Sequence, residues 1–136
     1  MAFTYAMKAL FTILLSVCVT FGTPLTHYFY SIDDVAGAMN AGNASQLSQY
    51  FDSRVEISLH DKSNSYSSRQ AEMILKDFFT THSVKTFRII HKGSNSGSEF
   101  CIGNLQTKNG IFRTTIFMKA RTEKQVLQEI RFEENE

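Results

Sequence analysis

The residue best placed to do chemistry is His91, which follows Phe87 and Ile89 at the two-residue spacing of a strand. Side chains at that spacing point to one face of a sheet, so the sequence predicts His91 on the apolar face with these two residues. A histidine there could act as a general acid or base if its pKa were shifted and a substrate lay within reach. The alternative is a hydrogen-bonded histidine at the rim of the sheet, and the sequence favours this alternative.

The carboxylates do not complete an acid–base pattern around this histidine. Asp33 and Asp34 fall in the first turn of a predicted helix, where the helix dipole favours negative charge. Asp52 and Asp61 fall at predicted strand boundaries. Because none of the carboxylates falls on a predicted core-facing strand position, we expect no catalytic residues.

Metal and thiol chemistry are also not favoured. A metal site would need His60, Asp61 and His91 to converge from separate strands. Cys101 has no basic or histidine neighbour in the sequence, so it is predicted to be a small buried hydrophobe. The alternative for this odd thiol is a disulfide between two copies of the chain. We predict no metal and no cofactor.

The composition excludes partners that are recognised by charge. Of the 136 residues, 43% are hydrophobic and 20% are charged, as in an ordinary globular domain. The formal net charge is only +1, and acidic residues such as Glu129 and Glu133 alternate with the basic residues of the last strands. The chain therefore lacks the electrostatic footprint that nucleic acid or an anionic membrane requires.

The first 22 residues have the layout of a secretory signal peptide. Lys8 precedes an apolar run over residues 9–21, and the small residue Gly22 follows. A membrane-spanning helix needs about 20 residues, and this run is shorter. An uncleaved segment that anchors the protein in the membrane is therefore the weaker interpretation. Val17 stands where a lipid-attachment motif has a small residue, so lipidation at Cys18 is not favoured. We predict cleavage after residue 22, a lead-in segment over residues 23–30, and a secreted or periplasmic protein without stable membrane insertion.

Residues 31–136 are expected to form a single domain that begins with two short helices. Ser31 and Asp34 have the spacing of a capping box at the start of the first helix. Gly42 is expected to end that helix, and Asn43 to cap the second one. Phe51 is expected on the apolar side of the second helix.

The rest of the domain is predicted to be a strand, a long helix and a sheet. Residues 54–60 alternate as a half-buried strand, and a short returning strand is expected around Tyr66. Ser67 and Gln70 form a second capping box, which opens a helix that runs to about residue 82. Four strands follow, separated by the turn sequences SNSG, KNG and RTEK. The sequence therefore predicts an α+β fold with helices on one side of a curved antiparallel sheet.

This order of elements resembles the cone-shaped nuclear-transport-factor-2-like (cystatin-like) superfamily. The segments GNASQLSQYF, YSSRQAEMILKDFF, FRIIHKGSNSGSEFCIGNLQTKNGIFR and EIRFE look, more closely, like those of a family of small exported bacterial proteins of unknown function. The resemblance implies the fold and export, and it implies no reaction. The superfamily includes isomerases, dehydratases, transport adaptors and non-catalytic subunits, so the fold does not define the function.

We therefore expect a non-catalytic binding module. Its first expected partner is a second copy, bound through the open sheet face at Phe117 and Leu127, which would give a homodimer. The second is a small apolar ligand in the cone, although residues of this kind are also needed to fill a core. An isomerase or dehydratase that uses His91 is the alternative function. The candidate pocket residues are Phe51, Ile57, Ile74, Phe78, Ile89, His91, Met118 and Phe132.

Overall fold

The computed structural model describes residues 30–122 and 124–135. The predicted signal peptide, Cys18 and all of the lead-in segment except Tyr30 lie outside the described residues. None of the described helices is long and apolar enough to cross a membrane. The described elements are α2 (Ile32–Asn40), α3 (Ala44–Ser48), β1 (Phe51–Leu59), β2 (Lys62–Ser67), α4 (Ser68–His82), β3 (Val84–Asn95), β4 (Ser98–Thr107), β5 (Gly110–Arg121) and β6 (Lys124–Glu134).

Both predicted capping boxes are present. The hydroxyl of Ser31 accepts a hydrogen bond from the backbone N–H of Asp34 at 3.4 Å, and the Asp34 side chain accepts one from the Ser31 N–H. Ser67 and Gln70 make the same reciprocal pair at the start of α4, with the Gln70 N–H 3.3 Å from the Ser67 hydroxyl. Each box gives two backbone N–H groups at the start of its helix a side-chain acceptor, and so favours a helix that begins there.

A corner separates α2 from α3. Gly42 adopts a φ of +60°, which favours glycine, and the Asn43 side chain accepts a hydrogen bond from the Gln46 N–H at 2.9 Å. The second helix is shorter than predicted, because Phe51 is already the first residue of β1. The carbonyl of Tyr50 accepts a hydrogen bond from the N–H of Leu127 in β6, so pairing with the sheet begins there.

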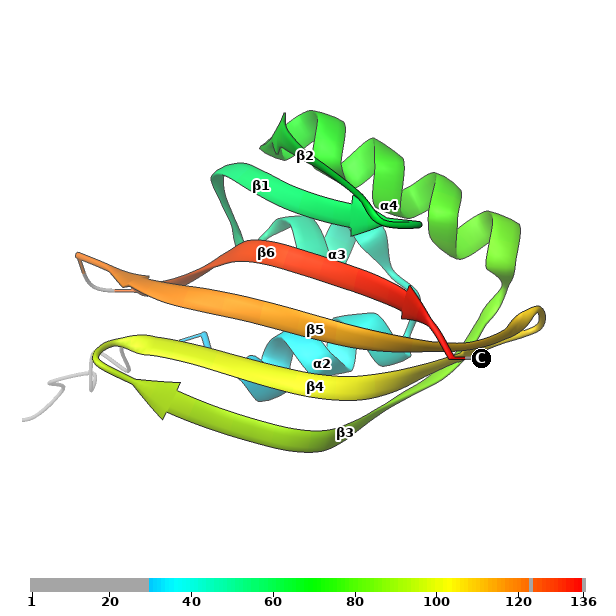
Figure 1. Ribbon diagram of the computed structural model, residues 1–136. Coiled ribbons are helices and arrows are strands. Elements are labelled where there is room, and N and C mark those ends of the chain that lie inside the picture. Colours follow the sequence, from blue (N-terminus) through cyan, green and yellow to red (C-terminus); the bar gives the residue numbers. More distant parts are fainter. Residues whose placement is uncertain (1–29, 123, 136) are drawn as a thin grey trace, which may run out of the picture.

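The six strands form one sheet in the order β2-β1-β6-β5-β4-β3 (Figure 1). All neighbours are antiparallel except β1 and β6, which are parallel, so the first strand lies between the edge strand β2 and the last strand β6. In Figure 1 the sheet lies in front of α2 and α3, and α4 lies beside β1 and β2. The other face, which we call the open face, carries no described helix.

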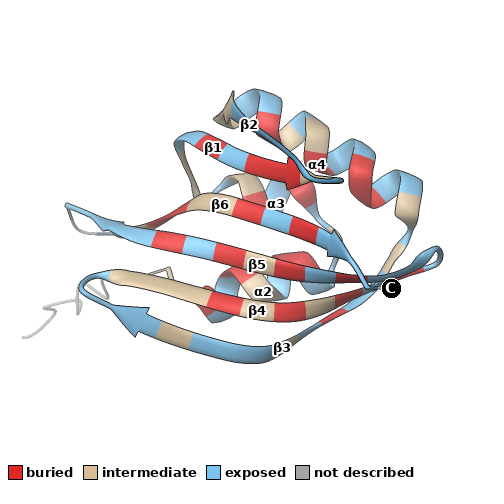
Figure 2. Cartoon of the chain, viewed as in Figure 1, coloured by how far each residue is buried: buried red, intermediate tan, exposed pale blue. Residues whose placement is uncertain are grey.

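The core lies between the helices and the sheet. Buried and exposed residues alternate along β5, as expected for strands with one covered face (Figure 2). The side chains on the helix side include Cys101, Ile116 and Ile130, which are aligned across β4, β5 and β6 and are fully buried. The helices add buried side chains such as Val35 and Leu75.

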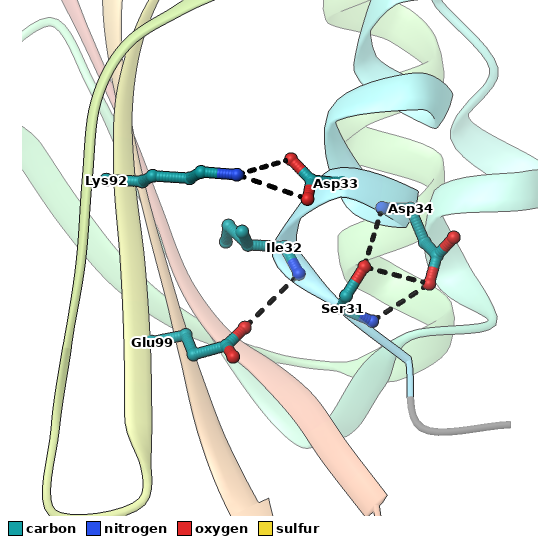
Figure 3. Close-up of polar contacts among 6 residues, drawn as sticks. All are labelled: Ser31, Ile32, Asp33, Asp34, Lys92 and Glu99. Atoms are coloured by element: carbon teal, nitrogen blue, oxygen red, sulfur yellow. Dashed lines mark hydrogen bonds and ion pairs between the residues drawn. The ribbon is translucent and has the colours of Figure 1, made fainter. Parts of the chain in front are cut away.

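Polar contacts fasten the start of α2 to the sheet (Figure 3). The ammonium of Lys92 in β3 lies 3.1 Å and 3.2 Å from the two carboxylate oxygens of Asp33. The backbone N–H of Ile32 donates to the Glu99 carboxylate of β4 at 3.3 Å. Glu99 thus satisfies a free donor at the positive end of the helix, and α2 is held against β3 and β4.

Candidate functional site

Side chains fill the region predicted as a cone pocket. Ile57, Phe78, Met118 and Phe132 are all at most 5% exposed, and the rings of Phe78 and Phe132 are 4.4 Å apart. Of the remaining candidates, three are partly buried and pack against the same core: Phe51, Ile74 and Ile89. Seven of the eight candidate pocket residues therefore contribute to the core. The sequence could not distinguish this role from ligand binding, because both need apolar side chains.

The eighth candidate, His91, lies outside this region, so its predicted orientation is wrong. The pairing of β3 with β4 shifts between Ile89 and His91, which leaves Ile90 as an extra residue. Beyond the bulge, Lys92 is aligned with the buried Cys101, and His91 is exposed on the open face opposite Ile102. One extra residue reverses the alternation of all the residues that follow it.

The predicted position of Leu127 on the open face is also wrong, because of a second bulge. Phe117 of β5 is aligned with Glu129 of β6, but the next residue, Met118, is aligned with Leu127, so Gln128 is extra. Leu127 is fully buried on the helix side with Met118 and does not lie on the open face. Phe117 does lie on the open face and is 37% exposed.

The open face instead carries an aromatic and aliphatic patch over β3, β4 and β5. The ring of Phe100 lies 5.7 Å from that of His91 and 6.1 Å from that of Phe117. Ile102 is aligned with His91 on one side and with Thr115 on the other. We call His91, Phe100, Ile102 and Phe117 the open-face patch. Phe100 and Ile102 were not among the candidates predicted from the sequence. The signal was present, because both flank the apolar Cys101 in β4 and so must face the other side of the sheet.

The remaining sequence candidates have structural roles. Cys101 is fully buried, and its burial, with a smaller effect from the Asp33 carboxylate, raises the pKa of the thiol to about 12 against the opposing effect of Lys92. His60 and Asp61 form the β1–β2 turn with positive φ, and His60 Nδ1 lies 3.1 Å from a Glu134 oxygen. Within the described part of the chain, no group of three or more His, Cys, Asp or Glu side chains could hold a metal ion.

Comparison with solved structures defines the class of protein. A protein from Cytophaga hutchinsonii described as an NTF2-like protein of unknown function matches with a TM-score of 0.57 and 6% identity, over 76% of this chain and 86% of that chain. A Kribbella flavida structure labelled as a ketosteroid isomerase matches with a TM-score of 0.59 and 8% identity, over 76% of this chain and 74% of that chain. The chain has the nuclear-transport-factor-2-like fold, as the sequence predicted.

The particular family follows from closer matches. A family model described as Domain of unknown function (DUF4783) matches residues 32–133. A crystal structure of a DUF4783 family protein from Bacteroides uniformis is 33% identical, with a TM-score of 0.76, over 79% of this chain and 99% of that chain. No protein with a curated description matches the chain. The chain belongs to the DUF4783 family, which confirms the resemblance seen in the sequence.

Proposed function

We propose that this protein is a non-catalytic binding module that pairs with a second copy of itself through the open face of its sheet. The observation that carries the proposal is the open-face patch, in which aromatic rings and an isoleucine lie on a sheet face that no described helix covers. Exposed apolar groups of this kind mark interaction surfaces when they form one contiguous patch.

The size of the open face suits a stable pair. Six strands about 4.8 Å apart, with about ten residues each at about 3.3 Å per residue, give a face of about 24 Å by 33 Å, or about 800 Å². A standard interface buries about 800 Å² on each partner.

The charges around the patch favour a second copy over a partner of one charge. Both signs occur on the same face, and Arg131 pairs with Glu129 at 2.8 Å within it. In a two-fold pair the same surface meets itself, so a face with mixed charges can place its cations against the anions of the partner. The cations include Arg54, Arg88, Arg113, Lys119, Arg121 and Arg131, and the anions include Asp52, Glu56, Glu129 and Glu133.

A small apolar ligand is a second candidate, and a groove beside α4 favours it. The groove has a volume of about 370 Å³ and includes Ile74 and Phe78, two of the predicted pocket residues. Met73, which is 66% exposed, lies on its edge. This groove replaces the filled interior of the cone as the place for such a ligand.

The proposed location is outside the cytoplasm, in the periplasm or the surrounding medium. The signal-like layout of residues 1–22 supports it. N-terminal sequencing of protein isolated from its source is expected to begin after residue 22. A chain that begins at Met1 or Met7 would contradict cleavage.

Native mass spectrometry of gently purified protein tests both binding proposals together. The expected spectrum shows two chains, and a retained small molecule would appear as added mass. Ile102→Lys puts a charge at the centre of the patch and should shift the protein to single chains. Met73→Lys, which alters an exposed apolar residue on α4, is the matched control and should leave the pair intact. A monomeric native protein, or a pair that persists in Ile102→Lys, would refute pairing through the patch.

A further inference from the structure

A polar hollow of about 530 Å³ lies on the open face where β1, β5 and β6 meet. Its volume is within the range of small-molecule sites, about 300–1,000 Å³. Of the open-face patch, it includes only Phe117. It also shares Arg54, Glu56, Lys119 and Glu129 with the face proposed for self-association, so sugar binding and the oligomeric state are measured separately.

Two irregularities in neighbouring strands produce this hollow. Phe51 is aligned with Leu127, and Glu56 is aligned with Glu129, so β1 takes five residue steps where β6 takes two. Gln128 is also the extra residue of the β5–β6 bulge. Bulges re-aim side chains and are frequent beside binding sites. Here they bring side chains from β1 and β6 together above the sheet.

The resulting polar network is held in place. The Asp52 carboxylate is 15% exposed and accepts hydrogen bonds from Arg121 Nη2 at 2.8 Å and Gln128 Nε2 at 3.2 Å. The Ser53 N–H also donates to Asp52, at 2.8 Å. Burial alone would raise the pKa of Asp52, but these hydrogen bonds and the Arg121 charge lower it overall. A charged carboxylate fixed by several donors is a preorganised group rather than a mobile surface side chain.

The charges lining the hollow balance. Three cationic and three anionic side chains surround it, together with the exposed ring of Phe117 and the hydroxyls of Ser53, Ser65 and Ser98. Balanced charge gives no electrostatic preference for an anion such as phosphate or for a cation. The charged residues are Arg54, Lys119, Arg121, Asp52, Glu56 and Glu129.

A hollow lined by hydrogen-bond donors, acceptors and one aromatic ring suits one chemical class. A hydroxyl group donates and accepts at once, so adjacent hydroxyls of a polyol can bridge a carboxylate and a guanidinium. The C–H face of a sugar ring can also cover the apolar face of Phe117. We propose that this hollow binds a neutral polyhydroxylated molecule, of the size and kind of a monosaccharide, through Asp52, Arg121 and Phe117.

Amide NMR titration of the purified full chain tests this inference. The probes are glucose, galactose and N-acetylglucosamine, each at up to millimolar concentration, with inorganic phosphate as the charged comparison. At least one sugar should shift, with saturation, the amides of residues 52–54, 117–121 and 128–129, and phosphate should not. No saturable shifts with any of the three sugars, or shifts at these residues with phosphate alone, would overturn the inference.

Two arginine variants of β5 give the matched control. Arg121→Gln removes the guanidinium that orients Asp52, and the loss of a hydrogen bond to a charged group should weaken sugar binding about tenfold. Arg113→Gln changes an arginine of the same strand and face that does not line the hollow, and it should leave binding unchanged. Equal affinities in the two variants would overturn the assignment. The oligomeric state is measured separately, so failure here leaves the self-association proposal intact.

Discussion

Gly103 and Gly37 differ in the space that is available for the Cβ atom of an alanine. At Gly103 of β4 a Cβ atom would lie 2.5 Å from Phe87 Cζ and 2.7 Å from the Arg88 carbonyl oxygen. The first of these can relax by a ring movement, but the second is backbone of the neighbouring strand. At Gly37 of α2 a Cβ atom would meet nothing within 4 Å.

We predict opposite effects for alanine at these two positions. Gly103→Ala should lower the free energy of unfolding by about 1–3 kcal/mol, because the packed β3–β4 pair must move. Gly37→Ala should raise it by about 0.5–1 kcal/mol, because alanine costs less backbone entropy in a helix. Urea denaturation of both variants measures the difference. A stabilised Gly103→Ala protein would contradict the described packing of Phe87 over Gly103.

Residue orientation was the part of the site that the sequence could not supply. The alternation rule placed His91 with Ile89, and Leu127 on the face of Phe117, but each inference crosses a bulge. A bulge depends on how two strands pair, and neither strand alone contains that information. Ile57 and Phe132 were oriented correctly because no shift in the pairing separates them from the buried Ile130 beside them. Met118 was oriented correctly because the extra residue of the second bulge, Gln128, lies in β6, so the alternation along β5 is unbroken.

At the scale of elements, the helix starts were predictable because their signals are local. Ser31 with Asp34, and Ser67 with Gln70, are three residues apart, and both pairs form the expected reciprocal hydrogen bonds. The parallel pairing of β1 with β6 was not predictable, because it joins segments about seventy residues apart in the sequence. That pairing moved Phe51 from the predicted helix into the sheet.

The α4 capping box gives a prediction at this scale. Ser67→Ala should lower the free energy of unfolding by about 1 kcal/mol, because the Gln70 N–H then loses its partner. Ser68→Ala, at the next position, keeps the capping hydroxyl and should have a smaller effect. Thermal or chemical unfolding of the two variants measures this. Equal losses would show that the cap does not set the start of α4.

Asp52, at the junction of β1 with β6, should make the free energy of unfolding depend on pH in the acidic range. The pKa of Asp52 is lower in the folded chain than its ordinary value, because hydrogen bonds from Ser53 and Gln128, with Arg121, outweigh burial. Its contribution to stability is therefore complete above the ordinary carboxyl pKa and is lost as the pH falls through the lowered pKa. Asp52→Asn should be less stable than the native chain at neutral pH, and this deficit should shrink in acid. A deficit that is constant across pH would contradict the network.

At the scale of the whole molecule, the sequence was sufficient for the fold class. The periodicity of α4 and the four turn-separated strands predicted helices on one side of a curved sheet, and the structure shows this arrangement. The fold leaves one sheet face without a helix cover, and the bulge in β3 adds His91 to the apolar groups on that face. The bulges that made the predicted orientations of His91 and Leu127 wrong thus also shape the surface to which we assign function.

Sedimentation equilibrium of the purified protein across the micromolar range tests the central claim most directly. A pair with an interface of standard size should have twice the mass of the single purified chain, which is 15.5 kDa for all 136 residues and less after the proposed cleavage, and should dissociate reversibly on dilution. A mass of one chain at every concentration would contradict the proposal that the open face binds a second copy.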